Sequence, residues 1–285
     1  MTEYSDGYWT SRDGLKLHYR DYPGRADRPA VVCLHGLTRN VRDFETLAER
    51  LAGEWRVICP EMRGRGDSDY AKDSATYNPV QYVDDLDALC EQAGIDRFVA
   101  IGTSLGGLMT LLIAMTTPDR LAAALLNDIG PVVEAAGLAR IRDYVGLGRS
   151  FPTWMHAARG IEESQAMAYP DYAITDWLAM AKRLMVLSGG DRIVFDYDMK
   201  IAEPLAKMDP NVQPDLWPGI DGLADKPVLL IRGALSDVLS DATLAAMQAR
   251  LPQAEAVTIP RVGHAPTLDE PEAVAGIERL LAKAG

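Results

Sequence analysis

The chain has 285 residues, of which 48% are hydrophobic and 25% are charged, and its formal net charge is −12. This is the composition of a globular protein with a sizeable core, and the excess of acidic groups argues against nucleic acid or an anionic membrane as a partner. No run reaches the roughly 18 apolar residues that a membrane span requires.

The first residues of the chain, 1–7, have neither a basic start nor an apolar run, so we expect no secretory signal. Cys33 and Cys59 fall in apolar stretches, and Cys90 falls in an amphipathic one. An odd number of cysteines at such positions predicts buried free thiols in a reducing compartment, without a disulfide framework or a metal site. The sequence therefore predicts a cytoplasmic protein.

Short apolar runs alternate with helical patterns along most of the chain, which predicts a mostly parallel sheet with helices on both faces. An alternating run at residues 16–20 predicts an early strand on which His18 is exposed. Further strands are predicted at residues 31–34, 55–59, 98–101, 121–127, 228–231 and 256–259. Helices are predicted at residues 43–51, 82–93, 105–116, 243–251 and 271–282.

A Gly-x-Ser-x-Gly motif at residues 102–106 joins a predicted strand to a predicted helix. Glycines two residues before and two after Ser104 omit the Cβ atoms that would collide in so tight a turn. Such a turn leaves the serine Oγ exposed above the sheet. Ser104 is therefore predicted to be a catalytic nucleophile.

The alternation of strands and helices stops near residue 131 and resumes after residue 214. We expect residues 131–214 to form a helical cap inserted into a core made of residues 1–130 and 215–285. Residues 131–210 hold six of the chain's 11 methionines and eight of its 20 aromatic residues. These side chains predict an apolar pocket facing the serine, with Trp154 and Met155 as its lining residues and Trp177 as a further candidate.

A serine hydroxyl needs a base to take its proton, and the chain has four histidines. His35 lies in an early glycine turn, and His156 lies in the predicted cap. Only His264 follows the serine at the end of a late strand. His264 is therefore predicted to be the base.

The imidazole in turn needs a carboxylate that fixes its tautomer. Asp237 follows the strand at residues 228–231 and precedes His264 by enough chain for one helix and one strand, so their loops can be neighbours. Asp237 is the predicted acid. Asp128, after the strand at residues 121–127, is the alternative, with a longer approach to the imidazole.

Together these motifs resemble those of the α/β-hydrolase superfamily over nearly the whole chain. His35-Gly36-Leu37-Thr38 is similar to its oxyanion loop, and Arg63-Gly64-Arg65-Gly66-Asp67-Ser68 is similar to one of its turns, although Glu61 stands where the family often has aspartate. The resemblance implies the α/β-hydrolase fold with a cap, and it implies an oxyanion hole made by the backbone N–H groups of Leu37 and Leu105. A serine at position 104 and the absence of a proline after His35-Gly36 argue against the dehalogenase and epoxide-hydrolase branches.

The sequence thus predicts a serine hydrolase that cleaves a small or medium carboxylic ester through an acyl-enzyme, with no cofactor and no metal. Its expected partner is a small acyl compound, and its oligomeric state stays open. Enol-lactone, thioester and carbon–carbon bond hydrolysis are alternatives, because fold does not fix the substrate. A binding protein that keeps the scaffold without turnover is the alternative from a different class.

Overall fold

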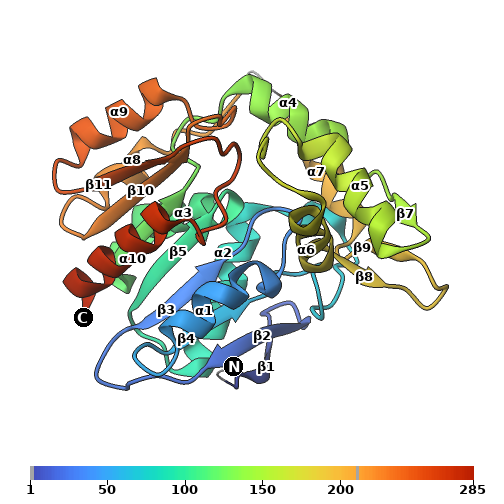
Figure 1. Cartoon of the computed structure of the whole chain (residues 1–285). Helices are drawn as coiled ribbons and strands as arrows, with labels where there is room; N and C mark the ends of the chain where they lie inside the picture. The colour runs from blue at the N-terminus through green and yellow to red at the C-terminus, as the bar shows by residue number, and fades with distance from the viewer. Residues whose placement is uncertain (1–2, 210–211) are drawn as a thin grey trace.

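A mostly parallel sheet forms the centre of the computed structural model, which describes residues 3–209 and 212–285 (Figure 1). The start of the N-terminal stretch and residues 210 and 211 of the predicted cap lie outside the described residues. Eight of the described strands form one sheet in the order β1-β2-β4-β3-β5-β6-β10-β11. The pairs from β4 to β11 are parallel, whereas β2 pairs with β1 and β4 in antiparallel fashion.

The bounds of the elements follow in chain order. The strands of this sheet are β1 (Ser5–Thr10), β2 (Lys16–Tyr22), β3 (Ala30–Leu34), β4 (Val57–Pro60), β5 (Phe98–Thr103), β6 (Leu121–Asn127), β10 (Val228–Gly233) and β11 (Glu255–Ile259). The α-helices are α1 (Glu45–Leu51), α2 (Pro79–Ala93), α3 (Leu105–Thr116), α4 (Ala135–Tyr144), α5 (Trp154–Gln165), α6 (Ile174–Leu184), α7 (Ala202–Lys207), α8 (Trp217–Asp221), α9 (Asp241–Arg250) and α10 (Pro271–Ala284). Short 3-10 helices are η1 (Val41–Phe44), η2 (Ser74–Thr76), η3 (Pro118–Arg120) and η4 (Met199–Ile201).

Helices cover both faces of the sheet, as the sequence predicted. Every residue of β3 and β6 is buried, which explains why these strands are continuous apolar runs rather than alternating ones. Apolar side chains of α2, α3, α8 and α9 pack on one face, and those of α1 and α10 pack on the other. The carboxyl ends of the parallel strands therefore point to one common edge, where a site can form.

His18 on β2 is buried, so the expectation of an exposed strand residue was wrong. The strand β1, which the sequence did not predict, pairs with β2 and covers this position. Each ring nitrogen of His18 lies 2.9 Å from a carboxylate oxygen, of Glu61 and of Asp6. Burial works against the charged ring, but the two carboxylates outweigh it and raise the pKa of His18.

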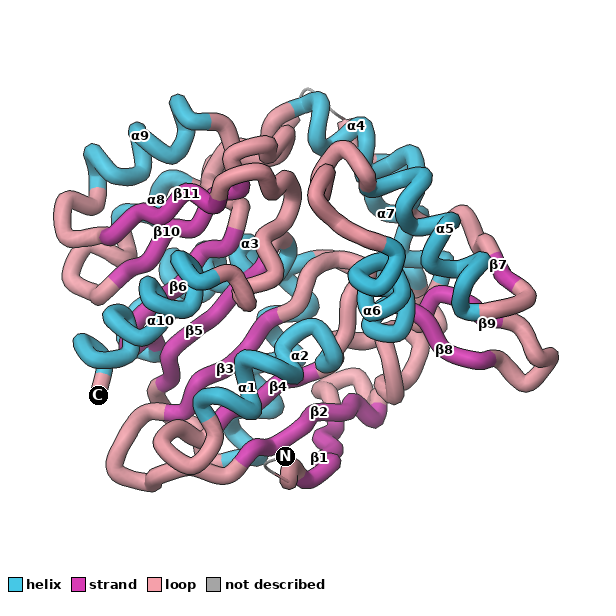
Figure 2. The backbone as a smooth tube through the Cα atoms, viewed as in Figure 1, coloured by secondary structure: helices cyan, strands magenta, loops and turns pink. Residues whose placement is uncertain are grey.

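The segment between β6 and β10 folds beside the carboxyl ends of the core strands (Figure 2). It contains α4, α5, α6 and α7, as the helical pattern predicted. It also contains a small antiparallel sheet in the order β7-β9-β8, formed by β7 (Ser150–Phe151), β9 (Ile193–Phe195) and β8 (Met185–Leu187). The expectation of a segment without strands was therefore wrong, because strands this short leave no period in the sequence. No helix of the described residues is both long and apolar enough to cross a bilayer.

Candidate active site

Ser104 stands in a strained turn between β5 and α3. Its backbone has φ 52° and ψ −112°, a conformation that L-residues rarely adopt. A Cβ at Gly102 would lie 2.5 Å from backbone atoms of Gly106, and a Cβ at Gly106 would lie 2.0 Å from the carbonyl oxygen of Leu34. The two glycines of the motif therefore allow strand, turn and helix to approach as closely as they do.

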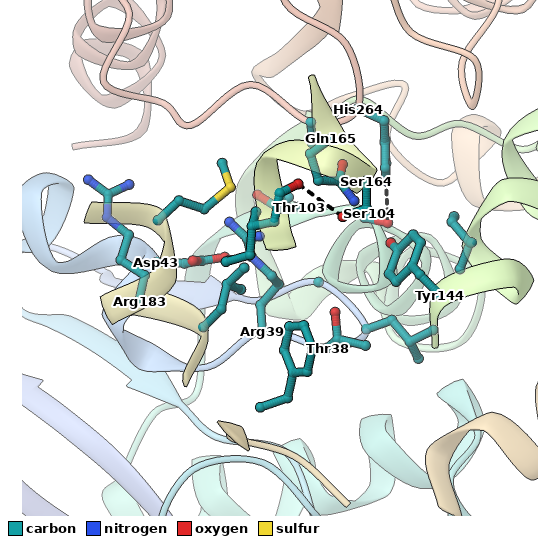
Figure 3. Close-up of a pocket in the computed structure, with 18 of the residues that line it drawn as sticks. Thr38, Arg39, Asp43, Thr103, Ser104, Tyr144, Ser164, Gln165, Arg183 and His264 are labelled. Atoms are coloured by element: carbon teal, nitrogen blue, oxygen red, sulfur yellow. Dashed lines mark hydrogen bonds and ion pairs between the residues drawn. The ribbon is translucent and has the colours of Figure 1, made fainter. Parts of the chain in front are cut away.

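A chain of hydrogen bonds runs from this serine to an aspartate. His264 Nε2 lies 2.9 Å from Ser104 Oγ, and His264 Nδ1 lies 2.8 Å from Asp128 Oδ2. Figure 3 shows His264 directed at Ser104. Because a carboxylate accepts hydrogen bonds, Nδ1 carries the proton and Nε2 is left free to accept one from the serine hydroxyl.

Asp128 is fully buried and held from two sides. Its Oδ1 accepts a hydrogen bond from Gly233 N–H at 2.8 Å, and its Oδ2 accepts one from the Ser236 hydroxyl at 2.6 Å in addition to that of His264. Its backbone is left-handed, with φ 55°. A carboxylate fixed in this way gives the imidazole a rigid partner.

The structure corrects the sequence-based choice of acid. Asp237 does not contact His264; it receives a two-pronged ion pair from Arg140 of α4, with Nε at 2.5 Å and Nη2 at 2.8 Å. Burial alone would raise the pKa of Asp237, but the hydrogen bonds from Arg140 outweigh it, and the pKa lies below its usual value.

The reason for the correction lies in the order of the strands. Thr103 of β5 is the direct neighbour of Asn127 of β6, so the next residues, Ser104 and Asp128, leave the sheet side by side. Asp237 comes four residues after the end of β10, which is one strand further from the serine. The approach from Asp128 is therefore the shorter one, contrary to expectation.

The loop after β3 passes beside the serine, since a Cβ at Gly36 would lie 3.8 Å from the Cβ of Ser104. His35 Nδ1 donates to the carbonyl oxygen of Gly36 at 2.7 Å, and the N–H of Arg39 donates to the same oxygen at 3.2 Å. Because N–H and C=O of a trans peptide point in opposite directions, the N–H of Leu37 is turned away from these donors. His35 Nε2 accepts from Met62 N–H at 3.1 Å, which requires the neutral ring.

The electrostatic environment keeps His35 in that form. Burial, with a contribution from the charge of Arg65, lowers the pKa of His35 to about 4. Arg65 also donates two hydrogen bonds, at 2.9 and 2.8 Å, to the carbonyl oxygen of Leu37. Leu105 is the first residue of α3, so its backbone N–H has no acceptor within the helix. An oxyanion hole made by the N–H groups of Leu37 and Leu105 stays a prediction.

Comparisons with known proteins agree with this geometry. A family model described as the alpha/beta hydrolase family matches residues 31–277. A 3-hydroxybutyrate-oligomer hydrolase of Cupriavidus necator is 33% identical over 267 residues, which cover 91% of this chain and 90% of that protein. The chain belongs to the α/β hydrolase family.

Two further relatives of this hydrolase differ widely in similarity. The crystal structure of an alpha/beta hydrolase from Novosphingobium aromaticivorans matches with a TM-score of 0.95 and 62% identity over 99% of both chains. The 2-(acetamidomethylene)succinate hydrolase of Mesorhizobium japonicum is 27% identical over 83% of this chain and 81% of that protein. The family is therefore shown, whereas the relatives are named for different substrates.

A cavity of about 360 Å³ opens above Ser104 in the hydrolase. Its wall combines the loop after β3 with α4, α5, α6 and the loop that carries His264, as Figure 3 shows in part. Neither Trp154 nor Met155 is among the described residues that line it, so the prediction for these two was wrong. Met155 is 49% exposed, and Trp154 packs against the apolar cluster inside the segment between β6 and β10, which is called the cap segment below.

Trp177 also belongs to that cluster rather than to the cavity. It is almost fully buried and contacts the rings of Tyr169 and Tyr172 edge-on, with centroid distances of 6.1 and 5.0 Å. The methionine and aromatic content of the segment thus serves mainly its own packing. Of these residues, those that line the cavity are Tyr144, Tyr169, Met180, Phe195 and Tyr197.

The loop that carries His264 is joined to the cap segment by hydrogen bonds. The N–H of Gly263 donates to the carbonyl oxygen of Ala168 at 2.6 Å, and the hydroxyl of Tyr169 donates to the carbonyl oxygen of Ala265 at 2.7 Å. Both flanks of His264 are therefore fixed by the residues that follow α5.

Sequence reasoning missed three polar residues at the site. Ser236 supports Asp128, Arg140 holds Asp237, and Arg39 lies in the cavity wall directly after the predicted oxyanion loop. For Arg39 the signal was available, because its position after His35-Gly36-Leu37-Thr38 places it near the serine. For Ser236 and Arg140 no signal was available, because their partners come from distant parts of the chain.

Proposed function

We propose that this hydrolase cleaves carboxylic esters through an acyl-enzyme, with Ser104 as the nucleophile. The observation that carries the proposal is the hydrogen-bonded chain from Ser104 Oγ through His264 to Asp128, which begins in the cavity. His264 Nε2 takes the serine proton as Oγ attacks the carbonyl carbon, and Asp128 stabilises the imidazolium that forms. The proton then passes to the leaving alcohol.

The negative charge of the tetrahedral intermediate falls on the former carbonyl oxygen. The N–H groups of Leu37 and Leu105 are proposed to donate to it, and a donor of this kind lowers the barrier by roughly 3 to 4 kcal/mol. Water, activated by the same imidazole, then releases the acid. All steps use groups of this chain, and no cofactor enters the proposal.

The substrate is proposed to be a small aliphatic ester. The relative from Cupriavidus necator is named for the hydrolysis of 3-hydroxybutyrate oligomers, which are esters. The alignment at 33% identity covers 91% of this chain and 90% of that protein. The cavity of about 360 Å³ suits a substrate of that size. A cytoplasmic location stays a prediction, supported by three buried free thiols.

Labelling with a fluorophosphonate tests the nucleophile. The adduct should map to Ser104 by peptide mass spectrometry, and Ser104→Ala should lose both labelling and ester hydrolysis. A panel of esters, thioesters and lactones then separates ester cleavage from the alternatives. An adduct on another residue, or full activity of Ser104→Ala, would contradict the proposal, and wild-type protein that binds esters without labelling or turnover would favour the binding protein.

A further inference from the structure

Four arginine side chains reach the wall of the cavity. They come from four parts of the chain, namely the turn after β3, α4, the turn before β7, and α6. The four residues are Arg39, Arg140, Arg149 and Arg183. A cavity that binds only apolar esters gains nothing from so many guanidinium groups, because each buried charge costs free energy unless it is paired.

Three of these arginines are paired with a carboxylate of the protein or lie away from the serine. Arg140 closes its fork on Asp237, with both Nε and Nη2 engaged. Arg149 is at an exposed place, with 42% of its side chain accessible, and pairs with Glu163. Arg183 contacts Asp269 at 3.4 Å and lies in Figure 3 on the far side of Asp43 from Ser104.

Arg39 differs from them in the way it is paired. Its Nε donates to Asp43 Oδ2 at 2.5 Å, but its two terminal nitrogens have no partner among the described residues. Asp43 Oδ1 is buried and likewise lacks a partner there. The pair is thus not the closed fork that Arg56 forms with Asp21, because the guanidinium is held at one edge and its other edge is open.

Arg39 lines the cavity close to the nucleophile. The Cγ of Arg39 and the Cβ of Ser104 lie 3.1 and 3.8 Å from the same point, the position that a Cβ would take at Gly36. The stem of Arg39 therefore begins beside the serine, and Figure 3 shows its side chain between Asp43 and Ser104. Only a quarter of the side chain is accessible. Two parallel N–H donors on a fixed guanidinium match the two oxygens of a carboxylate.

We propose that the terminal nitrogens of Arg39 bind a carboxylate of the substrate, so that the hydrolase acts on esters that carry a negative charge. The proposal rests on the proposed function of Ser104 and specifies its substrate class. The carboxylate belongs either to the acyl part or to the alcohol part of the ester. Asp43 orients the guanidinium through Nε and does not itself touch the substrate.

Matched pairs of esters test the proposal. Monophenyl succinate and methyl phenyl succinate differ by a charge on the acyl part, and acetoxybutyrate and its methyl ester differ by a charge on the alcohol part. The measured quantity is the ratio of kcat/KM for the charged ester to that for its neutral partner. Arg39→Gln should lower this ratio roughly 10- to 100-fold in one pair, mainly through KM, because a charge-assisted hydrogen bond is lost.

Further variants separate recognition from damage. Arg39→Gln combined with Asp43→Asn removes the carboxylate that the single change leaves unpaired, and it should show the same lowered ratio. Arg149→Gln, in the same cavity wall, should keep the ratio of the wild type. A ratio that Arg39→Gln leaves unchanged, that Arg149→Gln lowers equally, or that favours the neutral ester in the wild type would overturn the proposal.

A binding measurement makes the test independent of turnover. Monomethyl succinate, titrated calorimetrically into Ser104→Ala, should bind at least tenfold more weakly once Arg39→Gln is added, and equal binding would overturn the proposal. Hydrolysis by Ser104→Ala itself would instead contradict the proposed function. The two proposals therefore fail in different experiments.

Discussion

Asp128 and Asp237 are two aspartates near one imidazole, and their partners assign them different tasks. Asp128 faces His264 Nδ1 at 2.8 Å, whereas Asp237 is bound by Arg140. We expect Asp128→Asn to lower kcat by up to roughly 10⁴-fold with little change in KM, because the amide no longer holds the Nδ1–H tautomer. Steady-state kinetics on an ester measures this.

Asp237→Asn is the matched control for that change. It should alter kcat less than about tenfold, since its carboxylate stabilises the position of α4 and not the imidazole. A larger loss in Asp237→Asn than in Asp128→Asn would contradict the assignment of the acid.

His35 should make the stability of the fold depend on pH. Its pKa of about 4 in the folded protein lies below the value of 6.5 that holds for an accessible ring. The unfolded chain therefore binds more protons between these values, so the free energy of unfolding should fall by a few kcal/mol as the pH drops from about 6.5 to about 4. Urea unfolding at a series of pH values measures this.

Two substitutions check the origin of that slope. His35→Gln should flatten the curve between pH 6.5 and 4, because the group that takes up the proton is gone. His18 has a raised pKa, so its contribution to stability is present below pH 6.5 and is lost as the pH rises through its folded pKa. His18→Gln should therefore remove a loss of stability above pH 6.5 and leave the slope between pH 6.5 and 4 in place. A His35→Gln curve identical to that of the wild type would refute the explanation.

At the scale of elements, the junction of β5 and α3 depends on the absence of side chains. A methyl group at Gly106 would lie 2.0 Å from the carbonyl oxygen of Leu34, which is backbone of β3 and cannot move aside. We expect Gly106→Ala to cost several kcal/mol of unfolding free energy or to prevent folding. Gly189→Ala is the control, because nothing lies within 4 Å of its Cβ position, and it should change stability by less than about 0.5 kcal/mol. Equal stability of the two variants would show that the turn tolerates a wider separation.

Elements with a strong local pattern could be predicted from the sequence. The bounds of β6 and α3 are those expected, because β6 is a buried apolar run and α3 starts at the glycine motif. The edge strand β1 was missed, because Trp9 is its one buried residue and no alternation of apolar residues marks it as a strand. The short strands of the cap segment were missed for want of length.

The site was predictable where a motif is local and not where partners are distant. Ser104 and His264 sit in characteristic turns, and the structure brings them together. The choice between Asp128 and Asp237 depended on which strands are neighbours in the sheet, which a single sequence does not reveal. The side chains that line the cavity were not predictable either, since enrichment in aromatic residues does not distinguish a cavity wall from the inside of a cap.

For the whole molecule, the cap segment and the loop of His264 should act together. Tyr169→Phe removes the hydroxyl that donates to Ala265, leaving a part-buried carbonyl oxygen without this partner, at a cost of about 1 to 3 kcal/mol. Because that carbonyl is next to His264, we expect kcat for ester hydrolysis to fall roughly 3- to 10-fold. Kinetics and unfolding of the same samples measure both effects.

Tyr172→Phe provides the comparison, since the ring of Tyr172 stacks on that of Tyr169 but its hydroxyl donates to no described residue. It should leave both kcat and stability nearly unchanged. A loss of activity equal to that of Tyr169→Phe would mean that the aromatic packing, and not the hydrogen bond, positions His264.

Because the carboxylate for His264 follows β6, the loop after β10 contacts both the triad and α4 of the cap segment. Ser236 supports Asp128, and the very next residue, Asp237, fastens α4. We therefore expect that exchanging the segment between β6 and β10 among relatives leaves Ser104 and Asp128 in place, whereas His264 also depends on the hydrogen bonds that Ala168 and Tyr169 make to its neighbours. The incoming segment needs an arginine opposite Asp237, a backbone carbonyl opposite Gly263 and a hydroxyl opposite Ala265, and the parts of the cavity wall that come from α4, α5 and α6 change with it.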